Sequence, residues 1–172
     1  GDDIDDFAFS APDVPDVPHV PGSPGKVYVI YGNGSPSSNS VVTSLPTTDR
    51  FLLTGATPMY QLSSVASDGG DFNGDGIADI LLGTPKINTD QGTVLLIYGG
   101  SADFGVSGMA ASQGIKLEGV SLRDLLGSSL SSLPDMNGDG IGEILVGAPG
   151  YSYNKGVMYL LFGRDDDPST IG

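Results

Sequence analysis

The sequence predicts an all-β protein built from repeated four-stranded antiparallel sheets, the blades of a β-propeller. Three observations support this. The chain has 27 Gly and 12 Pro in 172 residues and no long helical periodicity, which indicates many turns. Its apolar runs are short, rich in branched and aromatic residues, and bounded by Gly and Pro, as is typical of buried strands. These runs also recur around an acidic loop, and such internal repetition is the signature of repeat folds.

The repeat is clear when segments of the chain are aligned. Residues 71–100 and 135–164 align without a gap and share 13 identical positions in 30. A partial copy opens the chain, where 1–12 matches 74–85 and 26–32 matches 93–99, with six extra residues between the two matches. We therefore expect one propeller segment over 1–172, divided into repeats 1–61 (partial), 62–126 and 127–172 (partial).

Each repeat has the same order of elements. A strand precedes the acidic loop, at 63–67 in one copy and at 127–133 in the next. An apolar run ending near a Pro follows the loop, then a second apolar run ending in Tyr-Gly or Phe-Gly. A last strand closes the repeat, at 51–55 and at 115–119. Four strands in roughly 60–70 residues is the size of one propeller blade.

One such sheet cannot bury both of its faces, so it needs a neighbouring sheet on each side. The chain begins inside an acidic loop and ends after the third strand of its last copy. It therefore holds about three blades, two of them incomplete, whereas a closed propeller needs at least four. We expect either a piece of a longer chain or a unit whose sheets are completed by a neighbouring subunit.

The acidic loops contain the candidate ligand residues of the sequence. Oxygen-bearing side chains alternate with other residues, a Gly-Asp-Gly core follows, and an acid closes the loop at its ninth position. The members are Asp71, Asn73, Asp75 and Asp79 in one copy, and Asp135, Asn137, Asp139 and Glu143 in the other. Glycine allows the positive φ that a concave turn needs. Ca²⁺ accepts six to eight mixed oxygen ligands and suits this set better than Mg²⁺, which requires stricter octahedral geometry.

Two other interpretations of the loops are weaker. An EF-hand requires a bidentate Glu at position twelve, but Leu82 and Val146 stand there, inside strand-like runs. An Asp/Asn/Gly-rich turn without a metal would hold three carboxylates together with no cation to offset their repulsion. A calcium loop between two strands is therefore the better prediction.

The segments NGDGIADILLGTP and NGDGIGEILVGAP resemble the FG-GAP repeats of integrin α-subunit-type β-propellers. The resemblance implies calcium held in the turn between the first two strands of a blade. By position it implies the carbonyls of Ile77 and Ile141 as further ligands, besides the eight side chains above. In the first, truncated copy it implies only Asp2, the Ile4 carbonyl and Asp6.

The chain departs from the family pattern at three places. Glu143 is one methylene longer than the expected Asp, so it binds calcium less tightly or through both of its oxygens. Asp3 stands where a Gly is expected. The Phe-Gly element appears as Leu126-Gly127 and is replaced near Gln61-Leu62.

Composition limits the partners. With 21 Asp+Glu against 7 Lys+Arg the formal net charge is −14, which disfavours nucleic acid and anionic membrane surfaces. The longest apolar run, 157–162, is far shorter than the roughly 20 residues of a membrane span. The chain has no Cys, which excludes disulfides and thiolate metal sites. A cation or a basic partner is the natural counterpart.

Two features lie outside the repeats. Proline recurs at every third residue from Pro12 to Pro24, with valine at the same period, which favours a polyproline II arm that docks on a partner. An extended surface loop is the alternative. Asn33 begins an Asn-Gly-Ser glycosylation sequon, which suits a secreted protein.

Catalysis finds little support. His19 is the only histidine, it lies in the proline-rich segment, and no Gly-x-Ser-x-Gly elbow is present. Paired carboxylates would suit glycoside hydrolysis, but the loops already account for the Asp residues. We do not expect an enzyme.

The expected function is an extracellular, calcium-stabilised β-propeller module for adhesion, ligand binding or protein–protein assembly, with a protein, a neighbouring subunit or a glycan as its partner. Two alternatives stay open. One is a structural subunit of an extracellular filament or surface coat, joined through incomplete blades and the proline-rich arm. The other is an accessory domain of a secreted enzyme.

Overall fold

The computed structural model describes residues 7–11, 26–31, 50–54, 65–86, 90–100, 104–105 and 109–165. The predictions for Asp2, Ile4, Asp6, Asn33 and the proline-rich segment lie outside these residues.

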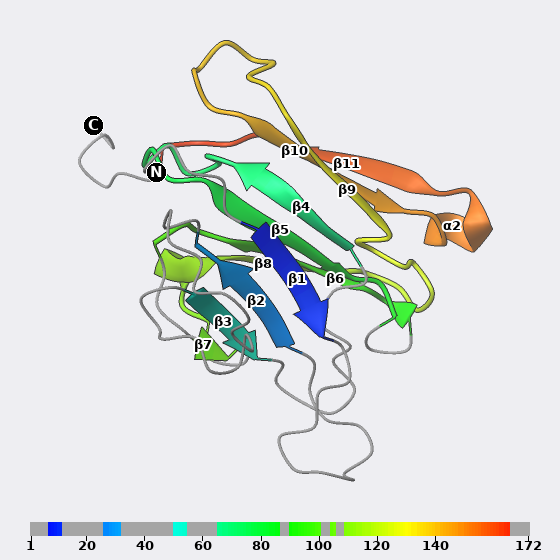
Figure 1. The fold of residues 1–172 in the computed structure, drawn as a ribbon. Helices are drawn as coiled ribbons and strands as arrows, with labels where there is room; N and C mark the ends of the chain where they lie inside the picture. Colours follow the sequence, from blue (N-terminus) through cyan, green and yellow to red (C-terminus); the bar gives the residue numbers. More distant parts are fainter. Residues whose placement is uncertain are drawn as a thin grey trace, which may run out of the picture.

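The described residues form three small sheets (Figure 1). The first contains β1 (Phe7–Ala11), β2 (Lys26–Ile30), β3 (Arg50–Thr54) and β7 (Phe104–Gly105). The second contains β4 (Val65–Gly70), β5 (Asp79–Thr84), β6 (Thr93–Ile97) and β8 (Gly114–Glu118). The third contains β9 (Ser129–Leu133), β10 (Glu143–Ala148) and β11 (Val157–Leu161). The only helical segments described are the short turns η3 (Ala111–Gln113) and α2 (Tyr151–Asn154).

The predicted fold class is confirmed. Sheets of three or four strands with almost no helix agree with partial propeller blades. Within each sheet, β7 apart, successive strands pair antiparallel, in the order predicted from the repeat. The strand before each acidic loop begins two residues later than predicted, at Val65 and at Ser129, because Ser and Gly residues leave no sharp apolar boundary there.

One strand pair was not predicted. β7 lies in the connection between β6 and β8 of the second sheet, yet it pairs with β3 of the first sheet, and the pair is parallel. The register places Leu53 opposite Phe104 and Thr54 opposite Gly105. A two-residue strand has no periodicity that could mark it in the sequence. This pairing joins the first two sheets through the main chain.

The central strands β5 and β6 of the second sheet are buried on both faces, and their side chains alternate between two cores. Leu82, Leu95 and Ile97 contribute to a cluster with β2 and β3 of the first sheet. Leu81, Val94 and Leu96 contribute to a second cluster, which includes Ile144, Val146 and Ala148 of the third sheet. A strand that is buried on both faces reads as a continuous apolar run, which explains the sequence of β5 and β6.

The second and third sheets meet closely at Leu126 and Gly127, the positions of the family's Phe-Gly element. Leu126 is buried in the second cluster, and its amide donates to the Gln91 carbonyl at 3.1 Å. The Gly127 amide donates to the Gly147 carbonyl of β10 at 2.9 Å. A Cβ on Gly83 would collide with the Gly127 carbonyl oxygen, so glycine is required for this approach. The seam between the two sheets therefore depends on main-chain contact.

Candidate cation-binding loops

The two complete acidic loops occupy equivalent places in the fold. One connects β4 to β5, and the other connects β9 to β10, so each joins the first two strands of its sheet. The glycines of each Gly-Asp-Gly core have positive φ: +74° at Gly74, +83° at Gly76, +86° at Gly138 and +91° at Gly140. These values favour glycine, because a side chain would be strained there.

The middle of each loop is held by the same side-chain bonds. In the first loop the Asp75 amide donates to Asn73 Oδ1 at 3.2 Å, and the Ile77 amide donates to Asp75 Oδ1 at 2.8 Å. In the second loop the corresponding bonds from Asp139 and Ile141 measure 2.9 and 2.8 Å. Both Asn side chains also donate to the following Asp at 2.9 Å. The carboxylates are therefore positioned by the loop itself.

The first acid of each loop accepts main-chain donors. Gly76 donates to Asp71 Oδ2 at 2.9 Å. Asp135 accepts from Gly138 at 2.6 Å and from Gly140 at 2.8 Å. The hydrogen bonds from Gly138 and Gly140 hold the pKa of Asp135 below its ordinary value, so this exposed carboxyl is ionised at neutral pH.

The closing acids are buried, and their oxygens are used differently. Asp79 is 2% exposed, and its two oxygens accept from the amides of Phe72 and Gly99, both at 2.9 Å. Burial raises the pKa of Asp79 to about 6 against the opposing effect of these two donors. Glu143 is 0% exposed and accepts from the Met136 amide at 2.7 Å through Oε2 alone.

Two buried carboxylate oxygens have no hydrogen-bond partner among the described residues. These are Asp71 Oδ1 in the first loop and Glu143 Oε1 in the second, and both atoms are buried. A buried carboxylate oxygen without a hydrogen-bond donor is costly, and a divalent cation would satisfy it. The donor set therefore fits the cation that the loop pattern implies.

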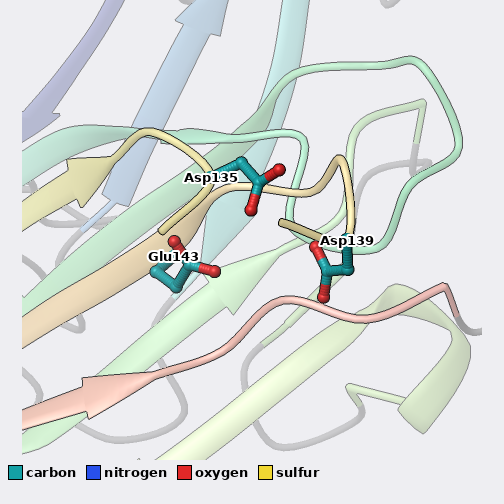
Figure 2. Close-up of side chains that lie close together, drawn as sticks. All are labelled: Asp135, Asp139 and Glu143. Atoms are coloured by element: carbon teal, nitrogen blue, oxygen red, sulfur yellow. The ribbon is translucent and has the colours of Figure 1, made fainter. Parts of the chain in front are cut away.

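Three carboxylates converge in the second loop. Asp135, Asp139 and Glu143 each offer an oxygen, and these atoms all lie within 4.8 Å of one another (Figure 2). No second group of this kind occurs among the His, Asp and Glu side chains of the described ranges. The main-chain donors Phe72, Gly99 and Met136 were not foreseen, because a backbone amide leaves no mark in the sequence. The roles of the Ile77 and Ile141 carbonyls stay predictions.

An apolar pocket of about 240 Å³ lies away from the loops, between β8 and β11. Its wall includes Leu117, Leu126, Val146, Ala148, Tyr159 and Leu161. The sequence could not reveal it, because its residues come from two separate sheets. Within the part of the chain that is described, no helix is long and apolar enough to cross a membrane.

Stacked sheets with an acidic, glycine-rich loop between their first two strands define a β-propeller-type repeat protein. The family model described as FG-GAP repeat matches residues 65–97 and 126–161. Both matched segments run from the strand before an acidic loop to the second strand after it. The resemblance identified in the sequence is therefore confirmed.

Integrin α subunits are among the proteins to which the chain is similar. Integrin alpha-M of Mus musculus is 34% identical over 85 residues, which cover 48% of this chain and 7% of that protein. Integrin alpha-4 of Xenopus laevis is 30% identical over 101 residues, 55% of this chain and 9% of the relative. Integrin alpha-5 of Xenopus laevis is 30% identical over 108 residues, 59% and 10% of the two chains. The chain thus matches a tenth or less of each of these proteins' length.

Proposed function

We propose that this chain is an extracellular, calcium-stabilised β-propeller module that serves adhesion or ligand binding without catalysis. One observation carries the proposal. Two loops 64 residues apart share the hydrogen bonds that hold their middle residues, and each keeps one buried carboxylate oxygen without a donor. A loop that only connects two strands gains nothing from a buried carboxylate oxygen without a donor. A calcium site uses such an oxygen as a ligand.

The residues that would hold calcium are the side chains of both loops and the Ile77 and Ile141 carbonyls. When bound, the ion supplies positive charge that offsets the repulsion among the clustered carboxylates. The chain's own part is to place those carboxylates. Asp79 begins β5 and Glu143 begins β10, so ordering a loop also fixes the start of the strand that packs into the core. Calcium is accordingly structural in this proposal.

Recognition would take place on a surface that the stiffened blades present. The relatives are integrin α subunits, which supports an extracellular setting and a protein ligand, with a glycan as the other candidate. The net charge of −14 favours a ligand with a basic surface. The calcium concentration outside cells suits loops of modest affinity.

Calcium titration by isothermal calorimetry tests the proposal. The chain should bind calcium, and a variant with Asp71→Asn and Asp135→Asn should lose that binding. Glu118→Gln is the matched control, because it removes a carboxylate of β8 that is paired with Lys116 at 2.7 Å and belongs to neither loop. Absence of binding at millimolar calcium, or equal binding by the double variant, contradicts the proposal.

A second candidate function is assembly with a neighbouring subunit. The observation that favours it is the third sheet, where β11 has no strand on its outer edge among the described residues. Large apolar side chains are exposed along this strand and just after it: Met158 (64%), Leu160 (41%) and Phe162 (52%). Sedimentation velocity tests assembly, and Met158→Ser with Phe162→Ser should abolish it. A wild-type chain that stays monomeric at high concentration in calcium excludes this function.

A further inference from the structure

The two loops have nearly the same sequence but end in different acids, Asp79 and Glu143. We propose that this one difference makes the loops unequal: the loop closed by Glu143 is the tighter calcium site and fills first. This inference rests on the proposed calcium function and adds to it an order of occupancy and a residue that sets it.

One oxygen of each closing acid has the same role. Asp79 Oδ2 accepts from the Phe72 amide at 2.9 Å, and Glu143 Oε2 accepts from the Met136 amide at 2.7 Å. Phe72 and Met136 occupy equivalent positions in the two copies, each directly after the first acid of its loop. Both closing acids are therefore tied back to the entrance of their own loop.

The other oxygen is used differently. Asp79 Oδ1 accepts a 2.9 Å hydrogen bond from the amide of Gly99, in the turn after β6. Gly163 is the equivalent of Gly99 in the third sheet, but Glu143 Oε1 has no partner among the described residues. Glu143 is one methylene longer than Asp79, and its carboxylate lacks the second hydrogen bond that Asp79 makes. Glu143 Oε1 is left uncommitted, while Asp79 Oδ1 shares its lone pairs with a main-chain donor.

Glu143 is also the acid that completes a convergent group. Its carboxyl is 0% exposed and lies within the 4.8 Å cluster that Asp135 and Asp139 complete (Figure 2). A buried carboxylate oxygen without a donor needs a partner, and a cation shared with the other two acids provides one. In the first loop the closing acid has both oxygens occupied by main-chain amides, so less of the carboxylate is available to an ion.

Calcium affinity rises with the number and charge of the oxygens that a loop can supply. Each loop keeps one buried carboxylate oxygen without a donor, Asp71 Oδ1 in the first and Glu143 Oε1 in the second. Among the described residues only the carboxyl of Glu143 converges with two other carboxylates, so the second loop offers an ion more oxygens in one place. Calcium should therefore fill the second loop before the first. The calcium concentrations that half-saturate the two loops should differ on the order of tenfold.

Residue-specific NMR on the full chain tests the order. The amides of Gly76 and Gly140 donate to the first acid of their respective loops, so each reports on one loop. In a calcium titration followed by ¹H–¹⁵N correlation spectra, the Gly140 resonance should saturate at roughly one tenth of the calcium that Gly76 needs. Saturation of Gly76 first, or of both together, overturns the inference while the calcium function stands. If neither resonance responds, the proposed function itself fails.

Variants of the closing acid identify its role. Glu143→Asp should raise the calcium concentration at the Gly140 midpoint to that of Gly76, and Glu143→Gln should raise it further. The Gly76 midpoint should stay unchanged in both variants. An unchanged Gly140 midpoint in Glu143→Gln would mean that Oε1 does not bind the ion, and it overturns the inference. The dispersion of the spectrum without calcium shows whether each variant is folded. The order in which the two loops of the wild-type chain fill is a test that needs no variant.

Discussion

The amide of Gly99 donates a 2.9 Å hydrogen bond to Oδ1 of Asp79. This bond ties the end of the third strand of the second sheet to the closing residue of the loop between its first two strands. The other oxygen of Asp79 accepts from Phe72 within the loop. One buried carboxylate therefore joins three parts of the sheet, and its contribution to stability can be separated from any role in binding metal.

Asp79→Ala leaves the buried amide of Phe72 and the partly buried amide of Gly99 without their acceptor. Each unsatisfied donor costs about 1–3 kcal/mol, so we expect a loss of about 3 kcal/mol in the free energy of unfolding. Urea denaturation in chelator measures this loss in the absence of metal. Asp75→Ala is the control, because Asp75 is an exposed residue of the same loop, and it should cost less than half as much under the same conditions.

Removal of calcium should lower the melting temperature. A ligand at a hundred times its dissociation constant stabilises the native state by about 2.7 kcal/mol per site, which corresponds to a shift of roughly 5–10 °C in a domain of this size. Differential scanning calorimetry with and without chelator measures the shift. The Asp71→Asn, Asp135→Asn variant should melt at the same temperature in both buffers, and a wild-type curve that chelator leaves unchanged would contradict calcium stabilisation.

The Leu126 side chain should contribute strongly to stability, since it is 5% exposed and lies in the core between the second and third sheets. Leu126→Ala removes buried apolar surface and leaves a cavity, so the expected cost is about 2–4 kcal/mol. Leu122→Ala is a matched control four residues earlier, because Leu122 is 64% exposed, and its effect should lie within about 0.5 kcal/mol of zero. Chemical denaturation compares the two, and equal effects would contradict the described packing.

Gly83 should tolerate no side chain. Its neighbour across the seam is the Gly127 carbonyl oxygen, a main-chain atom that cannot rotate away from an added Cβ. We expect Gly83→Ala to cost about 3 kcal/mol. Gly76→Ala provides the comparison, because an added Cβ there meets nothing within 4 Å and only the positive φ opposes it, at about 1 kcal/mol. A smaller effect at Gly83 than at Gly76 would show that the second and third sheets lie farther apart than the structure places them.

Much of the fold was predictable because its determinants are local. The runs around Leu81 and Leu95 are apolar without interruption, which indicates a strand covered on both faces, and the structure places a core on each side of them. The glycines of the acidic loops marked turns with positive φ, and the repeat placed these loops between the first two strands of a sheet. The pair between β3 and β7 escaped prediction, because two residues carry no pattern.

The order of residues therefore determines the repeat, the strands and the identity of the acids in each loop, since all of these follow from residue type and spacing along one segment. Tertiary structure alone decides which oxygen of those acids remains uncommitted. Gly99 reaches Asp79 across twenty residues, whereas Glu143 Oε1 has no such donor among the described residues. A hydrogen bond forms only when the donor–acceptor distance falls within a range of a few tenths of an ångström. How the strands and sheets pack around the loop decides whether that distance is reached.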